Sequence, residues 1–227
     1  MSSSIKPLNL YGGGPGPNPW KVVIYLKELE IPYETTVVKY ENLKTPEYEK
    51  VNPNGRLPAL YDPNTDITVW ESGAILEYLA EQYDKENKFS FPNFTADNYT
   101  AKTWLHYQMS GQGPYFGQAT WFKYYHPENV PSAFERYWKE SKRVVAVLNK
   151  HLEGKEYFVG DKFSYVDMAF FAWQVGFVKY VGQTENFDYD TEAPNVKAWI
   201  DRLTARPCIA EALKEQASYI PPPRDTK

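Results

Sequence analysis

The spacing of hydrophobic residues divides this chain into two differently built parts. Up to about Tyr83 the hydrophobic period changes repeatedly, whereas from Asp97 onward almost every segment has helical spacing. Between the two parts, residues 84–98 are first polar and then anchored by Phe and Pro, as a packed linker between domains would be. The sequence therefore predicts two domains, residues 1–88 and residues 89–227.

The first domain reads as alternating strands and helices. Apolar or Tyr/Thr/Val-rich runs predict strands at 8–11, 33–40, 57–61 and 67–70, and helical patterns predict helices at 20–29 and 72–83. Residues 41–50 form a charged connector that we read as helical, and the turn sequence at 62–65 joins the last two strands as a hairpin. The predicted order is βαβαββα, an α/β domain whose first βαβ unit pairs its strands in parallel.

The second domain reads as all-α. Helices are predicted at 96–110, 132–152, 194–204 and 209–217, with a glycine-rich aromatic interruption at 111–117. A further helix, apolar nearly all round and hence buried, follows Ser164. Ser164 and Asp167 have the spacing of a capping box, which places the start of that helix.

Composition excludes several classes of protein. The chain contains 12 Phe, 7 Trp and 19 Tyr, which is incompatible with wholesale disorder. Its net charge of -4, without a basic run longer than two residues, argues against nucleic-acid binding. A single cysteine, Cys208, and three separated histidines, at 106, 126 and 151, predict neither a disulfide framework nor a metal site. Without an apolar stretch of about 18 residues or a signal-peptide pattern, a cytoplasmic protein without a membrane segment is expected.

Three short segments of the first domain combine polar groups with strand ends. Asn18 and Pro19 have the residue types of an ordinary helix N-cap and first helical position, yet a helix N-terminus also attracts an anion or a thiolate. Pro58 begins a predicted strand, either as an ordinary edge proline or after a cis bond that turns the backbone of Leu57 toward an extended peptide.

The third segment is Glu71 and Ser72, which come directly before a predicted helix. The pair is either a capping turn or a site for an α-amino acid group, in which Ser72 binds the carboxylate and Glu71 binds the ammonium. All three segments are expected at one edge of the predicted four-stranded sheet.

This pattern resembles the cytosolic glutathione transferases over nearly the whole chain. The specific motifs are Asn-Pro-Asn-Gly-Arg-Leu-Pro-Ala-Leu at 52–60, Glu-Ser-Gly-Ala-Ile-Leu-Glu-Tyr-Leu at 71–79, and the capping box. Pro17 and Asn18 before Lys21, with Ser-Gly-Gln-Gly-Pro-Tyr at 110–115, look most like the Nu class and its fungal relatives of the yeast prion-forming nitrogen-catabolite regulator. The resemblance implies a thioredoxin-like N-terminal domain with a mixed four-stranded sheet, followed by an all-helical domain.

The resemblance also implies a glutathione site. Asn18 would contact the thiolate and be the catalytic residue, Leu57 before a cis Pro58 would pair with the cysteinyl backbone, and Glu71 and Ser72 would hold the γ-glutamyl end. Further contacts would come from Asn42, Arg56 and Lys44 at the glycyl end, and from Arg136. The alternative for Arg136 is an ordinary solvent-exposed charge on a helix. Glutathione would act as co-substrate, without a metal.

One position departs from the pattern. Nu-like proteins often have a hydroxyl residue two positions before the asparagine, where this chain has Gly16. No cysteine lies in this turn, so we expect no mixed-disulfide catalysis by the protein's own thiol, and Cys208 is read as a packing residue. Lowering a thiol pKa by about two units from about 8.5 requires ~2.7 kcal/mol, which an asparagine hydrogen bond and a helix dipole can supply together.

The resemblance implies glutathione transfer to a small hydrophobic electrophile or glutathione-dependent reduction of a disulfide, in detoxification or oxidative stress. The electrophile would bind among aromatic and polar residues of the second domain, namely Tyr107, Gln112, Tyr115, Phe116 and Trp121. The alternative is that these residues pack in the core of that domain. A homodimer is implied as well. The alternative is a carrier or regulatory protein that uses the same fold without catalysis.

Overall fold

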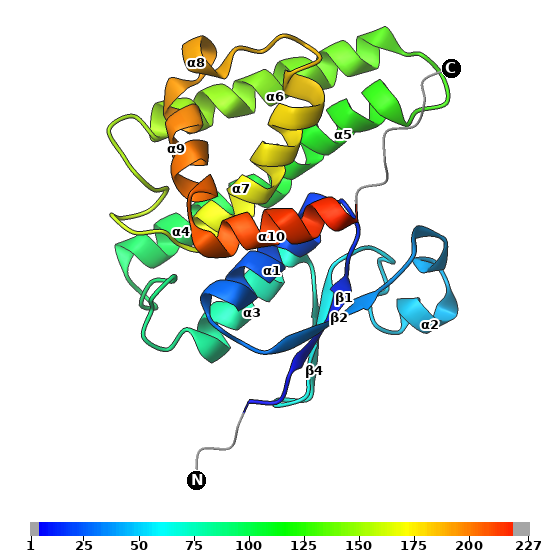
Figure 1. The fold of residues 1–227 in the computed structure, drawn as a ribbon, viewed down its shortest axis with the longest axis vertical. Coiled ribbons are helices and arrows are strands. Elements are labelled where there is room, and N and C mark those ends of the chain that lie inside the picture. The colour runs from blue at the N-terminus through cyan, green and yellow to red at the C-terminus, as the bar shows by residue number, and fades with distance from the viewer. Residues whose placement is uncertain (1–4, 220–227) are drawn as a thin grey trace. The chain divides into compact units, whose positions relative to one another are not determined.

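The computed structural model describes residues 5–219, apart from the side chains of residues 179 and 180. Two compact units are present (Figure 1). The first contains the described residues up to Lys85 together with those from Arg206 onward, and the second runs from Glu86 to Ala205. The α/β character of the first unit and the helical character of the second confirm the predicted fold class.

A mixed four-stranded sheet forms the centre of the first unit. Its strands are β1 (Leu8–Gly12), β2 (Tyr33–Val37), β3 (Ala59–Asp62) and β4 (Ile67–Trp70). Their order is β2-β1-β3-β4, with β1 parallel to β2 and the other two pairs antiparallel. Every second residue of β1 is buried, which is the period of two that a strand with one core face requires. The sheet has the predicted thioredoxin-like topology.

Two helices, α1 (Pro17–Glu28) and α3 (Ser72–Tyr83), pack against each other beside the sheet (Figure 1). The connector between β2 and β3 contains the 3₁₀ turn η1 (Tyr40–Asn42) and the short helix α2 (Pro46–Glu49). The buried carboxylate of Asp62 fixes the hairpin turn after β3, because it accepts hydrogen bonds from Tyr78, Tyr83 and Asn64.

Helix α10 (Pro207–Ser218) packs against α1 and therefore belongs to the first unit, whereas the sequence prediction placed this segment in the helical domain (Figure 1). Arg206 donates to both carboxylate oxygens of Glu28 at 3.0 Å, and Lys27 pairs with Glu211 at 2.8 Å. A bidentate pair between arginine and carboxylate is among the stronger and more directional polar contacts. Helical periodicity alone does not say which unit a helix covers, so this docking was not predictable from it.

The second unit is built from helices. They are α4 (Ala96–Tyr107), the π-helical turn η2 (Gln108–Gln112), α5 (Gly113–Tyr124), α6 (Pro131–His151), α7 (Tyr165–Phe177), the π-helical turn η3 (Val178–Gly182), α8 (Tyr189–Glu192) and α9 (Pro194–Thr204). Within residues 5–219, none of the helices combines the length and the apolar character that crossing a bilayer requires.

The predicted capping box is present at the start of α7. Asp167 Oδ2 accepts hydrogen bonds from the Ser164 backbone N–H at 3.0 Å and from its hydroxyl at 3.1 Å. Asp167 Oδ1 accepts from Phe158 N–H at 3.1 Å and from Trp199 Nε1 at 2.9 Å. Asp167 is fully buried, and burial raises its pKa to about 6, although the hydrogen bonds to its carboxylate oppose that rise. Asp167 thus joins the start of α7 to Trp199 of α9 and to Phe158 in the loop that precedes α7.

The predicted interruption at 111–117 is wrong. The chain continues through η2 directly into α5, so these residues are helical. Gly117 allows α5 to approach α7 closely, because a Cβ there would lie 3.3 Å from the Trp173 ring. Tertiary packing has overridden the low helix propensity of glycine.

Candidate glutathione site

The sheet register brings the three predicted segments to one edge. Tyr11 of β1 lies opposite Ala59 of β3, and Ala59 lies opposite Trp70 of β4. The turn that leads to Asn18 follows β1, Pro58 immediately precedes Ala59, and Glu71 immediately follows Trp70. One end of the sheet therefore carries all three.

Asn18 lies in the first turn of α1, although not at the position that capping preferences predicted. Helix α1 begins at Pro17, and Gly16 is its N-cap, with φ -64° and ψ 142°. Asn18 is thus the second helical residue, and its side chain is half-buried. The chain enters the helix two residues earlier than predicted, because Pro17 supplies a fixed helical φ at the first position, where its missing N–H costs nothing. The N-terminal end of the helix dipole lies at Asn18.

Gly16 leaves space for a side chain. A Cβ at this position would meet nothing within 4 Å, and the backbone is in an extended conformation that any residue adopts. We expect Gly16→Ser to raise the free energy of unfolding by about a few tenths of a kcal/mol, because a serine at the N-cap can accept a hydrogen bond from the first turn. Urea unfolding checks this. A lower midpoint would contradict the open, extended geometry.

The segment before Leu57 is held by one buried asparagine. Asn52 Oδ1 accepts from Asn54 N–H at 2.9 Å, and Asn52 Nδ2 donates to the Arg56 carbonyl at 2.7 Å. Gly55 has φ +56°, and a Cβ there would lie 2.4 Å from the Leu43 carbonyl oxygen, so only glycine fits. The tight loop leads into Leu57, and the bond from Leu57 to Pro58 is cis, as the family resemblance implied.

Glu71 and Ser72 form the turn into α3. Glu71 occupies the N-cap position with φ 72°, a positive value that is unusual for a residue with a side chain. Ser72 is the first helical residue rather than the cap, and it is buried. Its hydroxyl accepts a hydrogen bond from Lys21 Nζ of α1 at 3.1 Å. Backbone strain of this kind concentrates at binding sites.

The three residues predicted at the glycyl end lie on two exposed turns of the same unit. Asn42 ends η1, and its carbonyl accepts from the Thr45 hydroxyl at 3.1 Å. Lys44 Nζ donates to the Asn54 carbonyl, which joins this turn to the loop at 52–56. The carbonyl of Arg56 accepts from Tyr48 as well as from Asn52, and its side chain is exposed.

In the second unit, Arg136 belongs to a charged cluster on α6. Glu140 accepts hydrogen bonds from Arg136 at 2.9 Å and from Arg143 at 2.8 Å, and the two arginines, with Arg143 the stronger, hold the pKa of Glu140 below its usual range. The Arg143 guanidinium also lies 6.0 Å from the centroid of the Tyr115 ring. Sequence reasoning missed Arg143, although its spacing of seven from Arg136 places both on one helix face.

Tyr107 is the second predicted electrophile residue near this cluster. Its hydroxyl oxygen is buried without a hydrogen-bond partner among the described residues. Burial raises the pKa of Tyr107, and the nearby Arg143 opposes that rise. Tyr107, Tyr115 and Arg143 thus form a mixed aromatic and cationic patch of α4, α5 and α6.

The other three predicted electrophile residues lie elsewhere. Gln112 is fully buried and donates to Gln174 at 3.1 Å, and fully buried Phe116 stacks on Phe177 with ring centroids 3.8 Å apart. These two side chains are core residues of the helical unit, because neither has surface to offer a ligand. Trp121, by contrast, is exposed near the end of α5, where it stacks on Tyr125. The structure does not gather the five residues into one lining.

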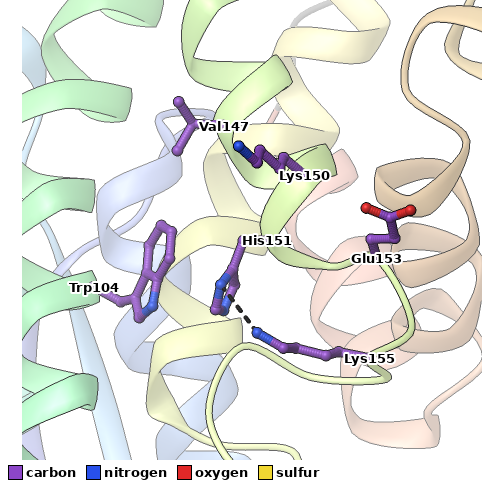
Figure 2. A pocket seen from close by; sticks show the side chains of 6 residues that line it. All are labelled: Trp104, Val147, Lys150, His151, Glu153 and Lys155. Atoms are coloured by element: carbon purple, nitrogen blue, oxygen red, sulfur yellow. Dashed lines mark hydrogen bonds between the residues drawn. The ribbon is translucent and has the colours of Figure 1, made fainter.

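A pocket of about 530 Å³ in the second unit contains none of the predicted residues (Figure 2). It is lined by Trp104, Val147, Lys150, His151, Glu153 and Lys155. His151 Nε2 lies 2.7 Å from the Phe158 carbonyl, and its Nδ1 lies 3.4 Å from Lys155 Nζ. Burial lowers the pKa of His151, so a neutral ring that donates to Phe158 and accepts from Lys155 fits both contacts. Through these two contacts, His151 connects the end of α6 to the loop that follows it.

Cys208 of α10 is half-buried, and burial raises the pKa of its thiol, with Glu28 adding to the rise. A thiol with a raised pKa is a weak nucleophile at neutral pH. Among the described residues, no group of three or more His, Cys, Asp or Glu side chains could hold a metal ion.

Comparison with known families gives a match in both units. Residues 6–81 match the glutathione S-transferase N-terminal domain, and residues 113–207 match the glutathione S-transferase C-terminal domain. The glutathione S-transferase-like protein gedE of Aspergillus terreus is 48% identical, over 97% of this chain and 99% of its own length.

Solved structures of fungal proteins are similar over the full fold. Glutathione transferase URE2P6 of Phanerochaete chrysosporium, crystallised with oxidized glutathione, is 45% identical with a TM-score of 0.89, over 97% of this chain and all of its own. Ure2p5 of the same fungus, cocrystallised with 1-(S-glutathionyl)-2,4-dinitrobenzene, is 42% identical with a TM-score of 0.86, over 95% of this chain and 97% of its own. The chain therefore belongs to the glutathione S-transferase family and is one of its Ure2p-like, Nu-class members.

Proposed function

We propose that this protein binds glutathione at the edge of its sheet and activates the glutathione thiolate for attack on a disulfide or a small electrophile. The observation that carries the proposal is the convergence of three segments at that edge: the α1 N-terminus with Asn18, Leu57 before cis Pro58, and Glu71 with Ser72. The similar fungal structures with oxidized glutathione or a glutathione conjugate support the choice of ligand.

Each end of the tripeptide has matching chemistry in this arrangement. The Ser72 hydroxyl and the N-terminus of α3 suit the γ-glutamyl carboxylate, and the Glu71 carboxylate suits its ammonium. The backbone of Leu57 can pair with the cysteinyl residue as a strand would. Asn42, Lys44 and Arg56 supply polar and cationic groups for the glycyl carboxylate.

Asn18 then lies where the thiol would be. Its amide can donate a hydrogen bond to the thiolate, and the α1 dipole adds to the stabilisation. In disulfide reduction, the thiolate sulfur attacks one sulfur of the substrate, the substrate S–S bond breaks, a mixed disulfide with glutathione forms, and the departing thiolate takes up a proton. In conjugation, the same thiolate forms a C–S bond and a halide leaves.

We place the second substrate on the helical unit at Tyr107, Tyr115 and Arg143, with Arg136 beside them through Glu140. A cationic group beside two aromatic rings suits a substrate with both an apolar and an anionic part, such as a glutathione adduct. Trp121 offers a separate exposed aromatic surface.

Steady-state assays on one preparation test the function. Glutathione-coupled reduction of hydroxyethyl disulfide and conjugation of 1-chloro-2,4-dinitrobenzene are measured together, with glutathione binding followed by calorimetry. We expect disulfide reduction to exceed conjugation, as the Nu-like motifs indicate. Binding without either reaction would instead favour a carrier or regulatory protein, and absence of binding would overturn the proposal altogether.

We also propose a homodimer, which the family resemblance implies. Phe94 is 88% exposed and Tyr99 is 57% exposed, and both lie at the start of the second unit, near α4. Large exposed aromatic side chains are enriched at protein interfaces. Sedimentation equilibrium measures the mass, and a monomer at micromolar concentration would contradict this assembly.

A further inference from the structure

Lys21 is a buried charged residue that the function described so far does not use. It lies in the second turn of α1, three residues after Asn18, and it is only 1% exposed. Lysine is almost never fully buried unless a partner compensates for the lost hydration of its ammonium group. A methionine at this position would fill similar space without that cost, so the cation calls for an explanation.

The ammonium group of Lys21 lies beneath the turn that begins α3. Nζ donates a hydrogen bond to Ser72 Oγ at 3.1 Å, and the Glu71 carboxylate acts on it electrostatically. Ser72 and Glu71 are also the two residues that the proposed function assigns to the γ-glutamyl group.

The chemistry of an ammonium group fixes the direction of this contact. It carries three donors and no lone pair, so Ser72 Oγ is the acceptor and the hydroxyl hydrogen points away from Lys21. A hydroxyl oriented in this way can donate to a carboxylate. The buried positive charge also attracts that carboxylate, because the interior screens charge less than water does.

We infer that Lys21 is a positioning residue for the γ-glutamyl group of glutathione, which holds the Ser72 hydroxyl as a donor to the ligand carboxylate and adds a positive charge beneath it. The inference rests on the proposed function, since it concerns the same ligand. Lys21 acts through Ser72 and need not touch the ligand itself.

A dependence on pH follows from this role. Burial lowers the pKa of Lys21 to about 7, and Glu71 opposes part of that shift. Below this pKa the residue is an ammonium, whereas above it the neutral amine can accept the Ser72 hydrogen and the positive charge is gone. Since the charged form is the one that favours a bound carboxylate, affinity should be highest at acidic pH and fall as pH rises through about 7.

Several other charged groups of the elements near α1 have their own partners. Asp84 at the end of α3 accepts from Tyr25, Asp62 of β3 accepts from Tyr78 and Tyr83, Glu211 and Glu215 of α10 pair with Lys27, and Arg206 pairs with Glu28. Among the described residues, the Glu71 carboxylate is the charged group that raises the pKa of Lys21.

Calorimetric titration with S-methylglutathione tests the inference, because this analogue has no thiol to titrate. At about pH 6 we expect Lys21→Met to bind it about tenfold to a hundredfold more weakly than the wild type, the range for loss of a charge-assisted hydrogen bond. The difference should shrink as pH rises, and Lys21→Gln should likewise lose the pH-dependent part. The ligand's own amino group titrates in all of these proteins, so it cancels in the comparison.

Lys27→Met is the matched control, since it removes a lysine of the same helix that pairs with α10, and its affinity should equal that of the wild type. Circular dichroism establishes that each variant is folded. If Lys21→Met does not fold, Lys21→Gln and the wild-type pH profile still decide. If the wild type binds and a folded Lys21 variant has the same affinity as the wild type at every pH, the inference about Lys21 is overturned, while the proposed function stands. Absence of wild-type binding would overturn the proposed function and the inference with it.

Discussion

Replacement of Asn18 by alanine is expected to lower glutathione-dependent turnover by about tenfold to a hundredfold at neutral pH, while glutathione still binds. The reason is the loss of one hydrogen bond to the thiolate, which contributes about 1.5 to 3 kcal/mol. Some activity should persist, because the dipole of α1 remains and contributes about 0.3 to 2 kcal/mol. Steady-state reduction of hydroxyethyl disulfide measures the loss.

The position of Asn18 makes this variant easy to interpret. Asn18 is the second helical residue and not the N-cap, so its replacement by alanine removes no N-cap residue from α1. Asn9→Ala is a suitable control, because Asn9 lies near the start of β1, where its side chain accepts from Thr36. Undiminished turnover in Asn18→Ala would mean that another group activates the thiol. An increase in KM without a fall in kcat would reassign Asn18 to binding.

Asp167→Ala is expected to lower the free energy of unfolding by more than about 4 kcal/mol, the largest stability effect that we foresee. Four donors end on this buried carboxylate: the backbone and hydroxyl of Ser164, the Phe158 N–H and Trp199 Nε1. Truncation leaves them unsatisfied inside the helical unit, at about 1 to 3 kcal/mol for each donor that water cannot reach. Urea denaturation followed by circular dichroism gives the value.

Two milder variants rank the contributions. Asp167→Asn retains the shape and one acceptor, and Ser164→Ala removes only the cap hydroxyl, at about 1 kcal/mol. The expected order of destabilisation is Asp167→Ala, then Asp167→Asn, then Ser164→Ala. A loss below about 1 kcal/mol in Asp167→Ala would show that the box is not a main support of the fold.

The same carboxylate predicts a pH dependence. Its folded-state pKa of about 6 lies above the ordinary value of 3.8, so between these values the folded protein binds a proton that the unfolded chain does not. The contribution of Asp167 to stability therefore declines as pH rises through this window and is constant above it. Because asparagine does not titrate, the advantage of wild type over Asp167→Asn should follow that course.

Local sequence signals predicted several elements well. Helix α3 begins at Ser72 and ends at Tyr83, as its apolar stripe indicated, and the capping box marked the start of α7. The order of the elements alone predicted that the segments at Asn18, Pro58 and Glu71 meet at one edge of the sheet. For the two helices, one periodic pattern or one pair of polar residues is enough to locate the element.

The predictions failed where another residue overrides a local signal. Capping preferences placed the N-cap of α1 at Asn18, whereas Pro17 starts the helix. Glycine content suggested a loop at 111–117, yet packing on Trp173 makes it helical. Buried Lys21 contacts Ser72, which lies 51 positions away in the chain. The helical pattern around Lys21 contains no signal that predicts this contact.

The state of the bound thiol tests the central claim most directly. Glutathione bound to the wild-type protein is titrated with pH while the ultraviolet absorbance of its thiolate is followed, with Asn18→Ala measured beside it. We expect a wild-type midpoint about two pH units below the ordinary thiol value of about 8.5, and a midpoint nearer that value in the variant. A wild-type midpoint equal to that of free glutathione would contradict it.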